Sequence, residues 1–189
     1  MKRHDAGFSL LEALVAVTIL ATAALSIAHL LVTSTRANLS SRKTTRAVIL
    51  AEQKMAQLKA LAWTTDDAGQ AVSDTVSNVA VFSATGACRS ASAGAAVGLT
   101  PSPPGTLAAN VDGYVDYVDM RGCALGGGSS PPAGTAYARR WAIGRPGGTD
   151  TLVFEVLVTP RVAVVGAGGA ARPLPDEALL VGAKARRMP

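Results

Sequence analysis

Histidine is scarce in this sequence and confined to its N-terminal part. The two histidines are His4 and His29, and none follows them. A serine or cysteine nucleophile in the rest of the chain would therefore lack the imidazole base that catalytic triads use. The glycine run at 126–128 is followed by two serines and lacks the Gly-Lys-Ser/Thr ending of a phosphate-binding loop. We expect a protein that is not an enzyme and that needs no cofactor.

Cysteine is nearly absent as well. The chain has two, Cys88 and Cys123, and two thiolates alone cannot fill a four-ligand zinc site, so we expect no metal. In an oxidising compartment a disulfide is favoured, and two unpaired buried thiols are the alternative. A bridge would close a loop of roughly 35 residues and stabilise the fold by about 3–4 kcal/mol.

Proline and glycine are both missing between Phe8 and Asp67, although the chain contains 19 glycines and 10 prolines. Charge is missing between Ala13 and Val32. The polar residues of that span are Thr18, Thr22, Ser26 and His29. Twenty helical residues with a rise of 1.5 Å cover about 30 Å, which is one hydrocarbon thickness. The pattern predicts a membrane-spanning helix.

Beyond the apolar span, the helical pattern continues with a single apolar face. Its residues recur in steps of three and four: Val48, Ala51, Met55, Leu58 and Ala62. We therefore expect one helix from about Phe8 to Leu61, whose second half packs against a globular head.

Aromatic residues make up only 4% of the chain, whereas hydrophobic residues make up 49%, so the core must consist mainly of small and aliphatic side chains. Short β-rich runs follow the helix. The candidates are 72–82, 114–119, 137–143 and 151–158, with weaker ones at 161–165 and 179–181. Loops rich in glycine and proline separate them at 98–106, 126–134 and 144–149. This order predicts an α+β fold, a long N-terminal helix packed on a small antiparallel sheet.

Three aspartates lie close together in one of the strand candidates. On a strand, Asp112 and Asp116 would share a face, while Asp119 would not. Two carboxylates could hold a calcium ion, but the spacing is not that of an EF-hand. We expect them to form a solvated strand face.

The net charge is mildly positive, at +5 for the whole chain, from 18 lysines and arginines and 13 acidic residues. Such an excess permits contact with acidic surfaces or nucleic acid but does not demand it.

A short basic leader, Met1–Gly7, precedes the apolar helix, which begins at Phe8. Glu12, the fifth residue counted from Phe8, is a carboxylate inside the apolar pattern. A charge in such a place is expensive and usually marks function. A basic leader ending in glycine, then phenylalanine, then this glutamate resembles the N-terminus of type IV prepilins, the family of pilins, minor pilins and type II secretion pseudopilins.

The resemblance implies processing and assembly roles for three residues. Prepilin peptidase would cleave between Gly7 and Phe8 and methylate the new amine of Phe8. Glu12 would pair with the amine of Phe8 on a neighbouring subunit, because a buried carboxylate needs a partner. The implied partners are other pilins or pseudopilins, the peptidase and methyltransferase, the inner-membrane assembly platform and the lipid bilayer.

The same resemblance divides the chain into four segments. They are a leader at 1–7, a transmembrane and filament-core helix at 8–34, an amphipathic helix at 35–65 and a β-rich periplasmic head at 66–189. The cations after the apolar span, Arg36, Arg42, Lys43 and Arg46, would favour a cytoplasmic head by the positive-inside rule. The leader motif and the cysteine pair favour a single-pass bacterial inner-membrane protein with its head in the periplasm.

Two further runs, 50–58 and 139–143, resemble PilV-type minor pilins, and the first also resembles the GspI-type minor pseudopilin. The sequence therefore favours a structural minor pilin of a type IV pilus. The alternatives are a minor pseudopilin of a type II secretion system and a minor pilin whose head binds DNA or another ligand. A membrane-anchored periplasmic enzyme is disfavoured, because the head contains no histidine and no catalytic set of residues.

Overall fold

The computed structural model describes residues 9–80, 88, 94–160 and 176–186 of the 189-residue chain. The chain divides into two compact units, residues 1–42 and residues 43–189. The expected processing residues Gly7 and Phe8 and the weak strand candidate at 161–165 lie outside the described residues.

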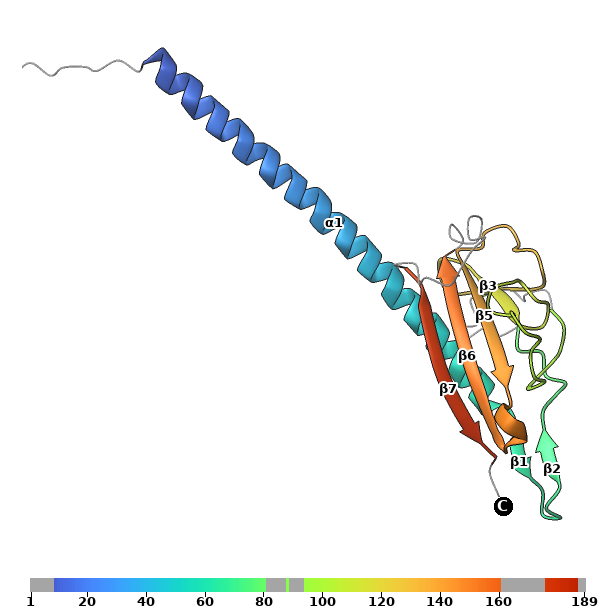
Figure 1. Ribbon diagram of the computed structural model, residues 1–189. Coiled ribbons are helices and arrows are strands. Elements are labelled where there is room, and N and C mark those ends of the chain that lie inside the picture. The colour runs from blue at the N-terminus through green and yellow to red at the C-terminus, as the bar shows by residue number, and fades with distance from the viewer. Residues whose placement is uncertain (1–8, 81–87, 89–93, 161–175, 187–189) are drawn as a thin grey trace, which may run out of the picture. The chain divides into compact units, whose positions relative to one another are not determined.

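One long helix, α1, runs from Leu10 to Ala60 (Figure 1). Its apolar half contains no residue that bends or breaks a helix, and its few hydroxyls are satisfied by the helix itself. Thr18 Oγ1 donates to the Val15 carbonyl at 2.8 Å, and Ser26 Oγ donates to the Thr22 carbonyl at 2.9 Å. By length and composition α1 can cross a membrane, and no part of its most apolar window is buried within the chain.

The helix ends at Ala60, whereas the expected amphipathic segment extended to residue 65. Strand β1, Trp63–Thr65, begins directly afterwards and pairs with β2, Ala71–Ser73. Trp63 is held there, because its Nε1 donates to the Asp150 carbonyl at 3.2 Å and the Arg186 guanidinium lies 3.6 Å above its ring. These tertiary contacts and two consecutive threonines favour a strand over another helical turn.

The main sheet has five strands in the order β4-β3-β5-β6-β7, and every neighbouring pair is antiparallel, as expected. Its strands are β3 (Val115–Val118), β4 (Ala124–Gly127), β5 (Tyr137–Gly144), β6 (Thr151–Pro160) and β7 (Ala178–Ala185). A single 3₁₀ turn, η1 (Pro146–Gly148), lies between β5 and β6.

The sheet differs from the expectation at both edges. β7 is longer than the run predicted at 179–181, and β4 occupies part of the loop predicted at 126–134. In β4, Gly127 approaches its neighbours closely, because a Cβ there would lie 2.9 Å from both the Val115 carbonyl oxygen and the Ala80 Cβ. The glycines that indicate a loop in the sequence thus permit a tightly covered edge strand.

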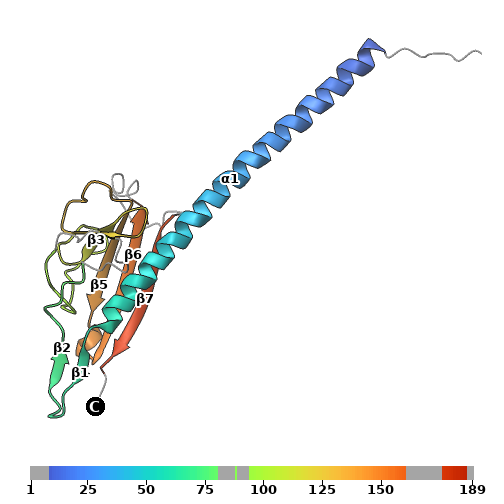
Figure 2. The same cartoon turned by 180° about the vertical axis from the view of Figure 1, so that it is seen from behind.

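The core of the second unit lies between the last turns of α1 and one face of the sheet (Figures 1 and 2). Ala47, Leu50, Ala51, Met55 and Leu58 are the buried apolar residues of α1. Trp141 and Ile143 of β5 and Leu152, Phe154, Val156 and Val158 of β6 belong to the same cluster. The predicted apolar face of the helix is therefore the face that packs on the sheet.

Candidate functional site

Glu12 lies in the first turn of α1 and is exposed in the isolated chain. The large apolar residues around it are also exposed, including Leu10 at 85%, Leu11 at 73% and Leu14 at 61%. An apolar surface of this extent calls for lipid or another protein as its cover. Glu12 is thus a carboxylate on a helix surface that is otherwise apolar.

Cys88 and Cys123 form a disulfide with a Cα–Cα distance of 5.4 Å, within the usual range for such bridges. Cys123 lies at the end of the turn between β3 and β4, and Asp119 organises that turn. Its Oδ1 accepts from the backbone N–H of Arg121 at 2.8 Å and of Cys123 at 2.9 Å. Burial raises the pKa of Asp119, but these hydrogen bonds outweigh it and hold that pKa below its usual value. The carboxylate therefore stays ionised and fixes the turn that carries the bridge.

A charged cluster is buried between α1 and the sheet. Asp116 of β3 accepts two hydrogen bonds from Arg139 of β5, from Nε to Oδ1 and from Nη2 to Oδ2, each 2.7 Å long. Lys54 of α1 lies 2.7 Å from Asp116 Oδ2. The side chains of Lys54 and Asp116 are both 0% exposed, and that of Arg139 is 2% exposed. The cluster joins three elements and carries one more positive than negative charge.

Lys54 has three acceptors for the three protons of its ammonium group. Besides Asp116, Nζ donates to Gln57 Oε1 at 2.7 Å and to the Val79 carbonyl. The ammonium also lies 4.4 Å from the centre of the Trp141 ring, whose negative face adds a further favourable contact. A buried charge is tolerable only with this degree of satisfaction.

The structure corrects the expectation of a solvated aspartate face. Asp116 is fully buried, whereas Asp112 is exposed, so the two do not share one solvated surface. The described residues contain no group of three or more histidine, cysteine and acidic side chains that could hold a metal ion. Asp116 binds Arg139 and Lys54 instead, because the inner face of β3 lies under α1.

Lys54 is the residue that the sequence reasoning overlooked. It lies three residues after Ala51 and four before Leu58, on the apolar face that the periodicity identified. A lysine at such a position either snorkels to water or pairs with a buried acid. The position of Lys54 on the apolar face was therefore the signal in the sequence that could have indicated a buried ion pair.

The pKa of Lys54 gives a testable pH dependence. Burial lowers it from 10.5 to about 8, against the attraction of Asp116. The folded state therefore binds fewer protons than the unfolded state between these values, and stability rises with pH across that window. A shift of this size corresponds to about 3 kcal/mol.

We expect the free energy of unfolding of the purified chain to increase from pH 8 to pH 10.5 relative to that of Lys54→Met, which has no ammonium at this position. Chemical denaturation of both proteins across this range measures the difference. Parallel pH profiles for the two proteins would show that Lys54 is not the group responsible.

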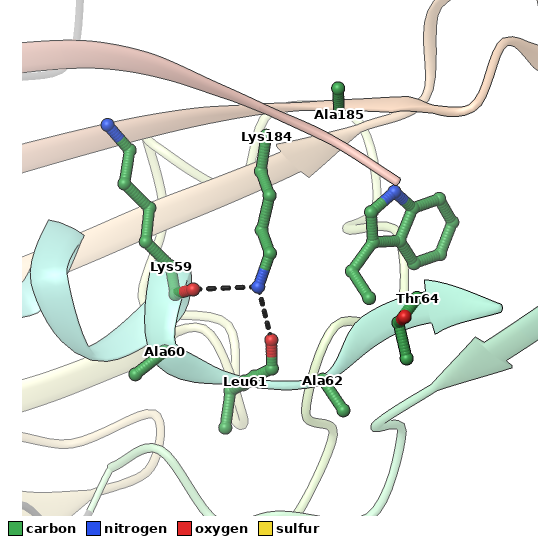
Figure 3. Close-up of a pocket in the computed structure, with 8 residues that line it drawn as sticks. Lys59, Ala60, Leu61, Ala62, Thr64, Lys184 and Ala185 are labelled. Atoms are coloured by element: carbon green, nitrogen blue, oxygen red, sulfur yellow. Dashed lines mark hydrogen bonds between the residues drawn. The ribbon is translucent and has the colours of Figure 1, made fainter. Parts of the chain in front are cut away.

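A lysine from β7 caps the C-terminal end of α1. Lys184 Nζ donates to the carbonyl of Lys59 at 2.7 Å and to that of Leu61 (Figure 3). Terminal carbonyls lack helical partners and carry partial negative charge, so a cation there is favourable. A hollow of about 500 Å³ beside this contact is lined by Ala60, Ala62 and Trp63 among others. Lys184 is itself one of the residues that line this hollow.

The comparisons with known proteins identify the N-terminal region. The family model described as the prokaryotic N-terminal methylation motif matches residues 2–28. No significant match is found among curated proteins or among solved structures. The motif and the long helix packed on an antiparallel sheet support a type IV prepilin-like protein of pilin-like architecture. Proteins of this kind are structural subunits, and their apolar N-terminal helix fits anchoring in the inner membrane.

Proposed function

We propose that the chain is a structural minor pilin of a type IV pilus. It is cleaved between Gly7 and Phe8, methylated at Phe8 and assembled through α1. The observation that carries this proposal is the methylation motif at residues 2–28 on a helix whose apolar surface the chain leaves uncovered. Before assembly, lipid covers that surface. In the filament, the helices of neighbouring subunits replace the lipid.

The disulfide supports a head that faces an oxidising compartment, here the periplasm. The cysteines belong to the second unit, whereas the apolar half of α1 belongs to the first. Assembly into a type II secretion pseudopilus would use the same motif, helix and glutamate, and it is the second candidate because the matched motif is common to both systems.

Glu12 has a defined role in this proposal. Its carboxylate meets the positive amine of Phe8 on the neighbouring subunit, which sets the axial register as subunits are added. Both charges leave water on assembly, and removing one partner leaves the other buried and unpaired. Removing one partner therefore costs more free energy in the filament than in the membrane pool, because in the membrane the end of the helix reaches the aqueous interface.

We expect Glu12→Leu to insert into the membrane and to be processed, while its incorporation into filaments falls at least about tenfold, since each 1.4 kcal/mol of lost pairing costs a factor of ten. Glu12→Asp should be intermediate, because it keeps the charge but shortens the reach. The measurement is the amount of each variant in sheared filaments relative to the membrane pool.

Thr18→Val is the matched control, because Thr18 bonds only to its own helix in the described part of the chain. It should enter filaments like the wild type. If Glu12→Leu enters filaments as well as the wild type does, Glu12 makes no assembly contact. That result is expected for a subunit at the filament tip, which has no neighbour ahead of it and needs no such pair.

A further inference from the structure

Two arginines follow the apolar span on α1 at positions that the assembly role leaves unexplained. Arg36 and Arg42 are exposed, and the described residues provide neither side chain with a hydrogen-bond or ion-pair partner. The next two cations differ. Lys43 Nζ lies 3.6 Å from Asp176, and Arg46 Nη1 donates to the Met120 carbonyl at 3.0 Å. Within the described residues of the second unit, contacts with the head thus engage Lys43 and Arg46.

The charge of this part of the helix has one sign. No aspartate or glutamate occurs between Glu12 and Glu52, so α1 provides no acid that could neutralise Arg36 or Arg42 from one turn away. Leu39 lies midway between the two arginines in sequence and is 54% exposed. At about 100° per residue, each step of three residues turns by about 60°, so the three side chains lie on one side of the helix within an arc of about 120°. We call Arg36, Leu39 and Arg42 the arginine strip.

The height of the arginine strip above the hydrocarbon fits a headgroup layer. With the apolar span ending at Val32, Arg36 lies about 6 Å and Arg42 about 15 Å further along the helix axis. Headgroups occupy about 5–8 Å on each side of the hydrocarbon. Arg36 therefore reaches the phosphates directly. Arg42 lies about 7–10 Å beyond the headgroup layer along the helix axis, which is about one Debye length, 8–10 Å.

We propose that the arginine strip binds anionic phospholipid headgroups where α1 leaves the bilayer, and so holds the subunit in the membrane before assembly. The guanidinium group suits this partner because it binds phosphate through two parallel hydrogen bonds. Leu39 enters the interface between the two contacts. The inference rests on the proposed membrane anchoring of α1, and it gives a role to two of the four cations that conflict with the positive-inside rule.

The test uses the full chain with Leu39→Cys, labelled with a polarity-sensitive fluorophore; the described residues contain no free cysteine that would compete for the label. The protein is reconstituted into vesicles of phosphatidylcholine alone or mixed with phosphatidylglycerol. We expect a blue shift of the emission in the anionic vesicles, which high salt reverses. Arg36→Gln combined with Arg42→Gln should abolish most of that shift.

The matched control, Lys59→Gln with Arg121→Gln, removes two exposed positive charges from the second unit and should keep the shift. Equal emission in both kinds of vesicle, or equal loss in the control, overturns the proposal. Alkaline extraction of the same vesicles separates the two levels of inference. A chain that is extracted contradicts membrane anchoring and the arginine strip together, whereas a retained chain without a shift contradicts the arginine strip alone.

Discussion

Asp116→Ala is expected to destabilise the head by about 3–5 kcal/mol, because it leaves two buried cations without their anion. Arg139 loses both of its charge-assisted hydrogen bonds, and Lys54 loses its only ionic partner in the described cluster. Neither cation can reach water, since their side chains are 2% and 0% exposed. The pKa of Asp116 lies below its usual value, because Arg139 and Lys54 together outweigh the effect of burial, so the acid is ionised under ordinary conditions.

Thermal or chemical denaturation of the purified chain measures this effect. Asp67→Ala serves as the control, because Asp67 is exposed and its removal should change stability by no more than about 0.5 kcal/mol. The combined variant Lys54→Met, Asp116→Leu, Arg139→Met should recover much of the loss, since a buried ion cluster can often be replaced by apolar side chains. An Asp116→Ala protein as stable as Asp67→Ala would contradict the claim that the buried ion cluster stabilises the head.

Gly7→Glu should abolish processing and leave the precursor in the membrane fraction. The residue before the cut must fit a protease cleft, and a glycine there presents no side chain to it. His4→Glu is the matched control, because it introduces the same side chain into the leader at a distance from the cut. We expect the control to be cleaved when it is expressed together with a prepilin peptidase, while Gly7→Glu keeps its full length. Normal cleavage of Gly7→Glu would place the processing site elsewhere.

Local patterns in the sequence predicted the long helix and most of the sheet. The absence of proline and glycine up to Asp67 predicts an uninterrupted helix, and the alternating or β-rich runs predict β3, β5 and β6. The Cys88–Cys123 bridge was the favoured of two alternatives, since two cysteines in an oxidising compartment can form one intramolecular bridge, and the structure confirms it over two unpaired thiols. These features depend on neighbouring residues and composition, which are visible in the chain itself.

The remaining features depend on contacts between distant segments. From the sequence, Asp116 is one of three neighbouring aspartates with a polar strand face. Its burial follows from the packing of β3 under α1, where it pairs with Lys54, 62 residues earlier in the chain. The glycines of β4 indicate a loop in the sequence. In the fold, Gly127 is needed because Val115 and Ala80 approach it too closely for a side chain. Trp63 belongs to a strand because Asp150 and Arg186 hold it there. Pairing over such separations cannot be derived from periodicity within one element.

The mass of the mature protein tests the central proposal most directly. The chain is expressed with its prepilin peptidase, purified from the membrane and measured intact and after proteolysis. We expect an N-terminal peptide that begins at Phe8 and carries one methyl group on its amine. An N-terminus at Met1, or one beyond Val32, would contradict the proposal.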